Sequence, residues 1–176
     1  VSNSVLAANK AKIPVITIDR ASDKGEVAVH IASNNIKGGE MAAEYIVSKL
    51  GEGTPVAELE GIPGASASRE RGQGFHNIAD KKLKVLAKQS ANFDRSQGLT
   101  VSENILQANP DVKAIFAQND EMALGAISAA KAANKQIFII GFDGTDDGVK
   151  AGKDGTMAAT IAHQPDKIGE IGVDAA

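Results

Sequence analysis

Four apolar runs in this sequence each end in a cluster of polar side chains. The clusters are Asp19-Arg20, Phe93-Asp94-Arg95, Gln118-Asn119-Asp120-Glu121 and Phe142-Asp143. Together they offer carboxylate, amide, guanidinium and aromatic groups. Planar polar groups can bond two neighbouring hydroxyls at once, and a flat ring can cover an apolar C–H face. This mixture suits a neutral polyol such as a sugar, and it indicates a binding site rather than a reaction centre.

A parallel sheet is needed to bring these clusters together, because the carboxyl ends of its strands share one edge. Strands are predicted at residues 14–19, 25–32, 55–60, 83–89, 114–117, 136–140 and 157–162. Helices are predicted at residues 35–50, 68–80, 96–108, 120–133 and 145–150. Short connections between alternating strands and helices imply right-handed crossovers. The predicted fold class is therefore α/β, with a mostly parallel sheet, and the run 14–19 is expected to be buried on both faces.

Both ends of the chain resemble incomplete elements. Residues 1–12 have the pattern of the last turns of a helix, and residues 164–176 begin a helix with Pro165 at a favourable early position. Polar residues interrupt the pattern at Ser33-Asn34-Asn35 and at His163-Gln164, which are the predicted domain crossings. We expect residues 1–33 to belong to one lobe, 34–163 to a second lobe, and 164–176 to return to the first.

Several function classes find no support in the sequence. The formal charge is −3 with no basic run, which argues against a nucleic-acid partner. The phosphate-binding glycine motifs are absent, and Ser66 stands in a segment that lacks the last glycine of a nucleophile elbow. None of the three histidines is expected to have an acidic companion at metal-ligand spacing. We therefore predict no metal, no cofactor and no catalytic residue.

The candidate residues also have plainer interpretations. Asn119 precedes Asp-Glu-Met and is a good helix N-cap, and Asp143 suits a turn or a cap. The pair Asp19-Arg20 could lie in an exposed loop. Arg71 is on a predicted helix, where a charge usually belongs to the solvated face. Three further polar strand ends favour a ligand role for the Asp19-Arg20 pair.

The same stretches resemble a known family. They include residues 13–20, 30–33, 69–72, 91–95, 116–126 and 141–145. In these segments the chain is similar to the bacterial periplasmic D-ribose-binding proteins, sugar-binding proteins of the LacI-like type I fold. The likeness covers essentially the whole chain, and residues 116–126 are its most specific part. It implies two Rossmann-like lobes with helices on both faces of each sheet, three hinge crossings and a sugar between the lobes.

The resemblance also implies a set of ligand-binding residues. They are Asp19, Arg20, Arg71, Phe93, Asn119 and Asp143, with Phe142 and Ser33 lining nearby. The sequence departs from the family at His163, which stands where the family has a glutamine that bonds the sugar; we include His163 in the site. From the same resemblance we expect the opening strands of the first lobe and the last crossing of the family to lie outside residues 1–176.

The function implied by the resemblance is that of the substrate-binding component of an ABC sugar importer. Such a protein binds D-ribose or a similar pentose in the periplasm and closes about its hinge. Its partners would be an ABC permease and a chemoreceptor. One alternative is the effector-binding core of a LacI-type transcription repressor. Another is a sugar-processing α/β enzyme, although the sequence shows no base, nucleophile or cofactor loop for it.

Overall fold

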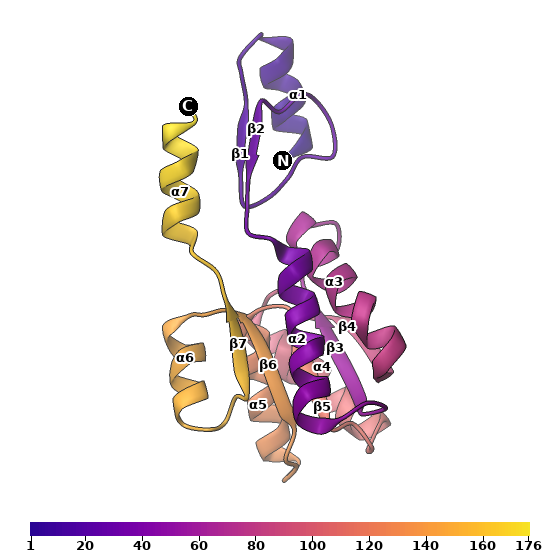
Figure 1. Cartoon of the computed structure of the whole chain (residues 1–176). Helices are drawn as coiled ribbons and strands as arrows, with labels where there is room; N and C mark the ends of the chain where they lie inside the picture. The colour runs from indigo at the N-terminus through magenta and orange to yellow at the C-terminus, as the bar shows by residue number, and fades with distance from the viewer.

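The computed structural model describes residues 1–176, which form two units joined by two passages of the chain (Figure 1). The larger unit contains a five-stranded parallel sheet with the strand order β4-β3-β5-β6-β7. The smaller unit contains a two-stranded parallel sheet, β1-β2, with helices beside it. The prediction of a mostly parallel α/β fold is confirmed.

The larger unit has helices on both faces of its sheet. Its strands are β3 (Pro55–Glu60), β4 (Lys84–Ser90), β5 (Ala114–Ala117), β6 (Phe138–Asp143) and β7 (Ala159–Ala162). Its helices are α2 (Asn35–Leu50), α3 (Ser66–Lys82), α4 (Arg95–Ala108), α5 (Asp120–Ala132) and α6 (Asp146–Lys153). Helices α2 and α3 pack together, as do α4 and α5, and α6 packs on α5.

Alternation along the strands divides the core into two layers. Phe116 and Ile140 join the cluster beneath α2 and α3, whereas Ile115 and Ile139 join the cluster with α4 and α5. Successive side chains of a strand point to opposite faces, so each central strand serves both layers. The sheet therefore carries two separate core clusters, one on each face.

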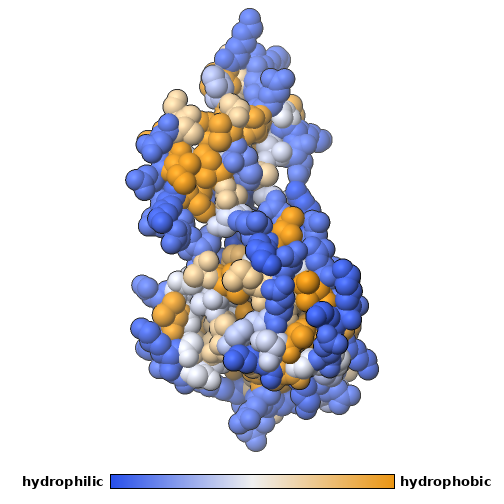
Figure 2. All heavy atoms as spheres, in the orientation of Figure 1, coloured by the Kyte–Doolittle hydropathy of each residue, from blue (hydrophilic) through white to orange (hydrophobic).

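The smaller unit consists of α1 (Ser2–Lys10), β1 (Ile16–Ile18), β2 (Val29–Ile31) and α7 (Pro165–Asp174). The expectation that the first strand is buried on both faces is wrong, because Ile18 is 44% exposed. Strand β1 has β2 as its single neighbour, and α7 covers only part of the face that carries Ile18 and Val29. Figure 2 shows the resulting apolar surface on this unit.

Helix N-caps fix the chain next to the carboxyl edge of the large sheet. The side chains of Asn34, Asp94, Asn119 and Thr145 each accept a hydrogen bond from a main-chain N–H in the first turn of the following helix. Helix α3 begins at Ser66, two residues before the predicted start, and β6 continues to Asp143, beyond the predicted 136–140. None of the helices combines the length and apolar character needed to cross a membrane.

Candidate ligand-binding site

A cavity of about 570 Å³ lies between the two units, at the carboxyl edge of the five-stranded sheet. Both units contribute to its wall. Seven of the nine predicted site residues line it, namely Asp19, Arg20, Arg71, Phe93, Asn119, Asp143 and His163. The shared edge of the five-stranded sheet accounts for Phe93, Asn119 and Asp143, as the parallel-sheet argument expected. Asp19 and Arg20 follow a strand of the separate two-stranded sheet and reach the same cavity from the other unit.

The main chain is strained at three of these residues. Asp19, Phe93 and Asp143 have φ angles of 63°, 60° and 116°, in the region that favours glycine. Such conformations cost about 1–3 kcal/mol each and tend to occur at functional sites, where the surrounding structure holds them. Each of the three ends a strand or follows one within three residues, and each lines the cavity.

Asp19 and Arg20 carry the contribution of β1 to the cavity. The Nε of Arg20 lies 3.9 Å from Oδ2 of Asp19, and its guanidinium lies 5.6 Å from the ring centroid of Phe93 in the other unit. Side chains of both residues are partly exposed, at 43% and 45%. Their hydrogen-bonding groups are thus accessible to a ligand, which is consistent with either a loop pair or a binding role.

Arg71 is buried, although its position on a helix suggested a solvated face. It is 4% exposed. Its Nη1 donates to the main-chain oxygen of Gln118 at 2.6 Å and to Oδ1 of Asp143 at 3.1 Å. The guanidinium carbon lies 3.7 Å from the ring centroid of Phe142. This environment holds the cation at the back of the cavity in a fixed orientation.

Burial dominates the electrostatics of the Arg71–Asp143 pair. Loss of water lowers the pKa of Arg71, and it raises the pKa of Asp143 above its usual range. The attraction between the two charges acts in the opposite direction in both cases but is the smaller effect. A polar ligand that bonds to both groups would compensate for the water they have lost.

Asn119 combines the two roles that the sequence left open. Its Oδ1 accepts from the N–H of Met122 at 3.0 Å, which caps α5, and its Nδ2 donates to the main-chain oxygen of Phe93 at 3.2 Å. It also lines the cavity and is 7% exposed. The cap therefore fixes the amide while one of its faces remains at the cavity.

Phe142 and Ser33 lie outside the wall of this cavity. Phe142 is 1% exposed and packs in the layer beneath α2 and α3, because it alternates with Asp143 along β6. Ser33 bonds to His163 instead, with its Oγ 3.1 Å from Nδ1. The other ring nitrogen of His163 lies 3.5 Å from Oδ1 of Asp143. Phe142 and Ser33 therefore each contact a residue of the cavity wall: Phe142 contacts Arg71, and Ser33 contacts His163.

Sequence reasoning missed the residues that complete the wall. They include Ile18, Ala67, Gly144, Thr145, Pro165 and Ile168. It also missed Asp120, a fully buried carboxylate that accepts from the N–H and Oγ1 of Thr145 at 2.8 and 2.9 Å and from Oγ1 of Thr160 at 2.7 Å. In the sequence Asp120 stands in one of the four polar clusters, but an acidic residue after a capping Asn indicated only a helix start and not a buried carboxylate.

The prediction that no histidine has an acidic companion was wrong for His76. Its ring nitrogens lie 2.6 Å from Oδ1 of Asp80, four residues later on α3, and 2.8 Å from Oε2 of the buried Glu58. These contacts raise the pKa of His76 to about 9, mainly through the hydrogen bond with Glu58. The two carboxylates bond to opposite ring nitrogens, so the group is an ion-pair chain rather than a metal centre.

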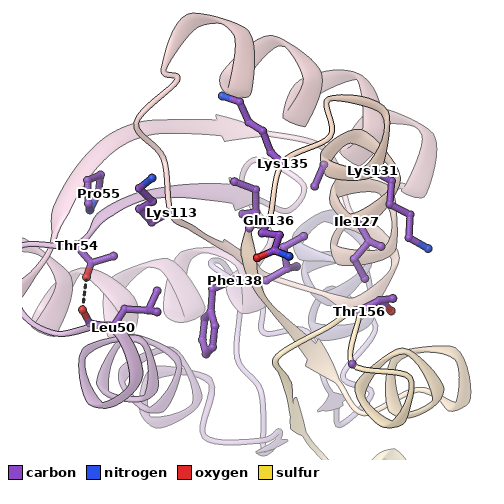
Figure 3. Close-up of a pocket in the computed structure, with 14 residues that line it drawn as sticks. Leu50, Thr54, Pro55, Lys113, Ile127, Lys131, Lys135, Gln136, Phe138 and Thr156 are labelled. Atoms are coloured by element: carbon purple, nitrogen blue, oxygen red, sulfur yellow. Dashed lines mark hydrogen bonds between the residues drawn. The ribbon is translucent and has the colours of Figure 1, made fainter.

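A second cavity, of about 670 Å³, lies at the opposite edge of the sheet, near the amino ends of β3, β5 and β6 (Figure 3). It is lined by Lys113, Lys131 and Lys135 among largely apolar residues. The Nζ of Lys135 is bonded to two main-chain oxygens, and Lys131 points away from Gln136. Its polar groups do not converge, and so the cavity between the units is the better candidate for a polar ligand.

The chain belongs to the periplasmic binding protein domain family, whose model matches residues 1–176. It is 57% identical, over its full length, to the ribose import binding protein RbsB of Bacillus subtilis, and 61% identical over 98% of its length to RbsB of Haemophilus influenzae. The chain covers 58% and 60% of those proteins, so it spans about three fifths of their length.

A solved structure with the same fold carries a sugar. The periplasmic binding protein of the arabinose ABC transporter from Shewanella sp. ANA-3, bound to α- and β-L-arabinofuranose, matches with a TM-score of 0.91 at 32% identity. The match covers 98% of this chain and 61% of that one. The relatives named here are binding proteins by name, of ribose import in two cases and of an arabinose ABC transporter in the third, and none of their names describes a reaction or a repressor.

Proposed function

We propose that residues 1–176 form the larger part of a substrate-binding protein of an ABC sugar importer, and that D-ribose or a similar pentose binds between its two units. The observation that carries this proposal is the gathering of seven predicted polar and aromatic residues around one cavity with walls from both units. The names of the RbsB relatives support ribose and import over a transcription repressor.

The chemistry of the cavity fits the hydroxyl groups of a pentose. Asp19 and Asp143 would accept from hydroxyls, Arg20 and Arg71 would donate, and Asn119 would do both. In addition, Phe93 would cover an apolar face of the sugar ring. A pentose has about 10 heavy atoms, so a micromolar dissociation constant requires about −0.8 kcal/mol per atom, and almost every hydroxyl must be paired.

The two units would serve as the lobes of a hinged receptor. We assign residues 1–33 and 164–176 to one lobe and residues 34–163 to the other. The chain passes between them at Ser33-Asn34 and at His163-Gln164 (Figure 1). Closure around the sugar would remove water from the cavity and create the surface that an ABC permease and a chemoreceptor recognise in the periplasm.

Calorimetric titration with D-ribose tests the proposal in the longer, two-lobed protein. Replacing Asp143 or Asn119 by Ala should weaken binding at least about 10-fold, because each leaves a sugar hydroxyl or a buried partner unpaired. Asp111→Ala is the matched control, since Asp111 is exposed in the loop that leads to β5, at the other edge of the sheet. Unchanged affinity in both cavity variants would remove these residues from the site.

Residues 1–176 alone should bind ribose weakly or undetectably. The apolar face of the smaller unit is uncovered, and Asp19 and Arg20 are partly exposed to water, where they gain little from a ligand. The same calorimetric titration checks this. A micromolar dissociation constant for this chain would show that the described walls are sufficient for binding.

A further inference from the structure

A buried amide connects a passage between the two units to the wall of the cavity. Asn35 is the first residue of α2, directly after the capping Asn34, and it is 2% exposed. Its Oδ1 accepts from Nε of Arg71 at 3.0 Å, and its Nδ2 donates to Oε2 of Glu70 at 2.9 Å. The amide is thus bonded on both sides to consecutive residues of α3.

Three of the five N–H donors of Arg71 have protein partners. Nε bonds to Asn35, and Nη1 bonds to the main-chain oxygen of Gln118 and to Asp143. Of the five N–H groups of a guanidinium, the two on Nη2 have no protein partner, and Arg71 lines the cavity. Phe142 supports the plane of the group from one side. The only amide side chain that fixes this plane is that of Asn35.

We propose that Asn35 is a positioning residue for ligand binding. It orients the unpaired Nη2 of Arg71 toward the cavity, and it couples that orientation to the conformation of the passage at residues 33–34. This inference rests on the proposed function of the cavity. Asn34 caps α2 through the N–H of Lys37 at 2.9 Å, so a rotation at the passage that disturbs the cap also moves the adjacent Asn35. The hinge and a ligand-binding cation would then share one hydrogen-bonded unit.

Exchanging donor and acceptor in the hydrogen bond between residues 35 and 70 tests the proposal. In the longer protein, Asn35→Ala should weaken ribose binding by about 10- to 100-fold, the usual effect of losing a hydrogen bond to a charged group. Asn35→Asp alone places a second carboxylate against Glu70 and should also bind weakly. The double variant Asn35→Asp/Glu70→Gln keeps an acceptor for Arg71, removes the repulsion between the two carboxylates and supplies a donor from residue 70, and it should recover affinity to within about 3-fold of the wild type.

Asn77→Ala is the matched control. Asn77 also links α3 to α2, through a bond from its Nδ2 to Oε1 of Glu40 at 3.1 Å, but neither residue lines the cavity. Its loss should leave ribose affinity unchanged. If Asn35→Ala does not fold, the comparison of Asn35→Asp with the double variant gives the answer. A folded double variant that binds no better than Asn35→Asp would overturn the proposal.

A second measurement does not depend on the sugar. The Nε–H of Arg71 should exchange slowly with solvent in NMR spectra of the ligand-free protein, quickly in Asn35→Ala, and slowly again in the double variant. If wild-type protein fails to bind ribose, the proposed function fails, and this signal still decides whether Asn35 holds Arg71. Slow exchange in Asn35→Ala would reject the positioning role whatever the ligand.

Discussion

Oγ of Ser33 lies 3.1 Å from Nδ1 of His163, so the two passages between the units are joined by a side-chain hydrogen bond. These residues are far apart in the sequence and meet where β7 leaves the large sheet and the chain enters α2. His163 also reaches Asp143 through its other nitrogen, at 3.5 Å. One imidazole therefore contacts the partner passage and the cavity.

Replacing His163 by Ala should weaken ribose binding in the longer protein by about 10-fold, because both contacts are lost. His163→Gln keeps a donor and an acceptor and should lose less. Calorimetry compares the two variants with wild type, and Ser33→Ala separates the contact between passages from the contact with Asp143. Equal affinity in wild type and His163→Ala would exclude the imidazole from the binding mechanism.

The His76–Glu58 contact predicts a pH-dependent part of the stability. The pKa of His76 is raised from 6.5 to about 9 in the folded chain, so protonation is tighter in the folded state than in the unfolded state. The contribution of protonated His76 to the folding stability is complete below pH 6.5 and is lost as the pH rises to about 9. Urea unfolding of wild type and His76→Gln should therefore give a difference in stability that is largest at and below about pH 6, shrinks as the pH rises through the window from 6.5 to about 9, and is lost above it. A difference that does not change with pH would contradict the assignment.

Much of the site followed from sequence because parallel strands end on one edge. Phe93, Asn119 and Asp143 end a strand of the five-stranded sheet or follow one within three residues, and short β–α connections place those ends at one edge. Asp19 follows β1 of the separate two-stranded sheet, so its place at the cavity depends on how the two units pack. The position of Arg71 could not be found this way. It lies on α3, and whether a helical charge faces water or a neighbouring helix depends on packing that a single sequence does not display.

Side-chain direction explains the remaining differences. Phe142 and Asp143 are adjacent in β6, so one faces the core when the other faces the cavity. The resemblance placed both residues near the sugar because it transfers positions in the sequence and does not specify which way each side chain points. The role of Asn35 was hidden for a similar reason: a polar residue after Asn34 indicated a crossing, but its bond to Arg71 joins residues 36 positions apart.

Asp120 and Glu121 are neighbours at the start of α5 with opposite environments. Asp120 is fully buried and accepts three hydrogen bonds, whereas the side chain of Glu121 is 43% exposed and is paired with Arg95 at 2.8 Å. Asp120→Ala should lower the free energy of unfolding by about 3 kcal/mol or more, because the N–H and hydroxyl of Thr145 and the hydroxyl of Thr160 lose their partner. Glu121→Ala should cost about 1 kcal/mol or less, as is usual for an exposed ion pair. Urea denaturation of the two variants measures the contrast, and equal losses would show that burial does not set the cost here.

Two glycines should respond in opposite ways to the same added methyl group. A Cβ at Gly39 of α2 would clash with the main-chain oxygen of Arg71 and lie 2.7 Å from the N of Phe75, whereas a Cβ at Gly152 of α6 meets nothing within 4 Å. Main-chain atoms of α3 cannot move aside without shifting the helix that carries Arg71. Gly39→Ala should therefore destabilise the chain by about 3 kcal/mol. Gly152→Ala should stabilise it by about 0.5–1 kcal/mol, because alanine loses less conformational freedom in a helix. Urea denaturation measures both, and weaker ribose binding in a folded Gly39→Ala variant would show that the spacing of α2 and α3 sets the position of Arg71.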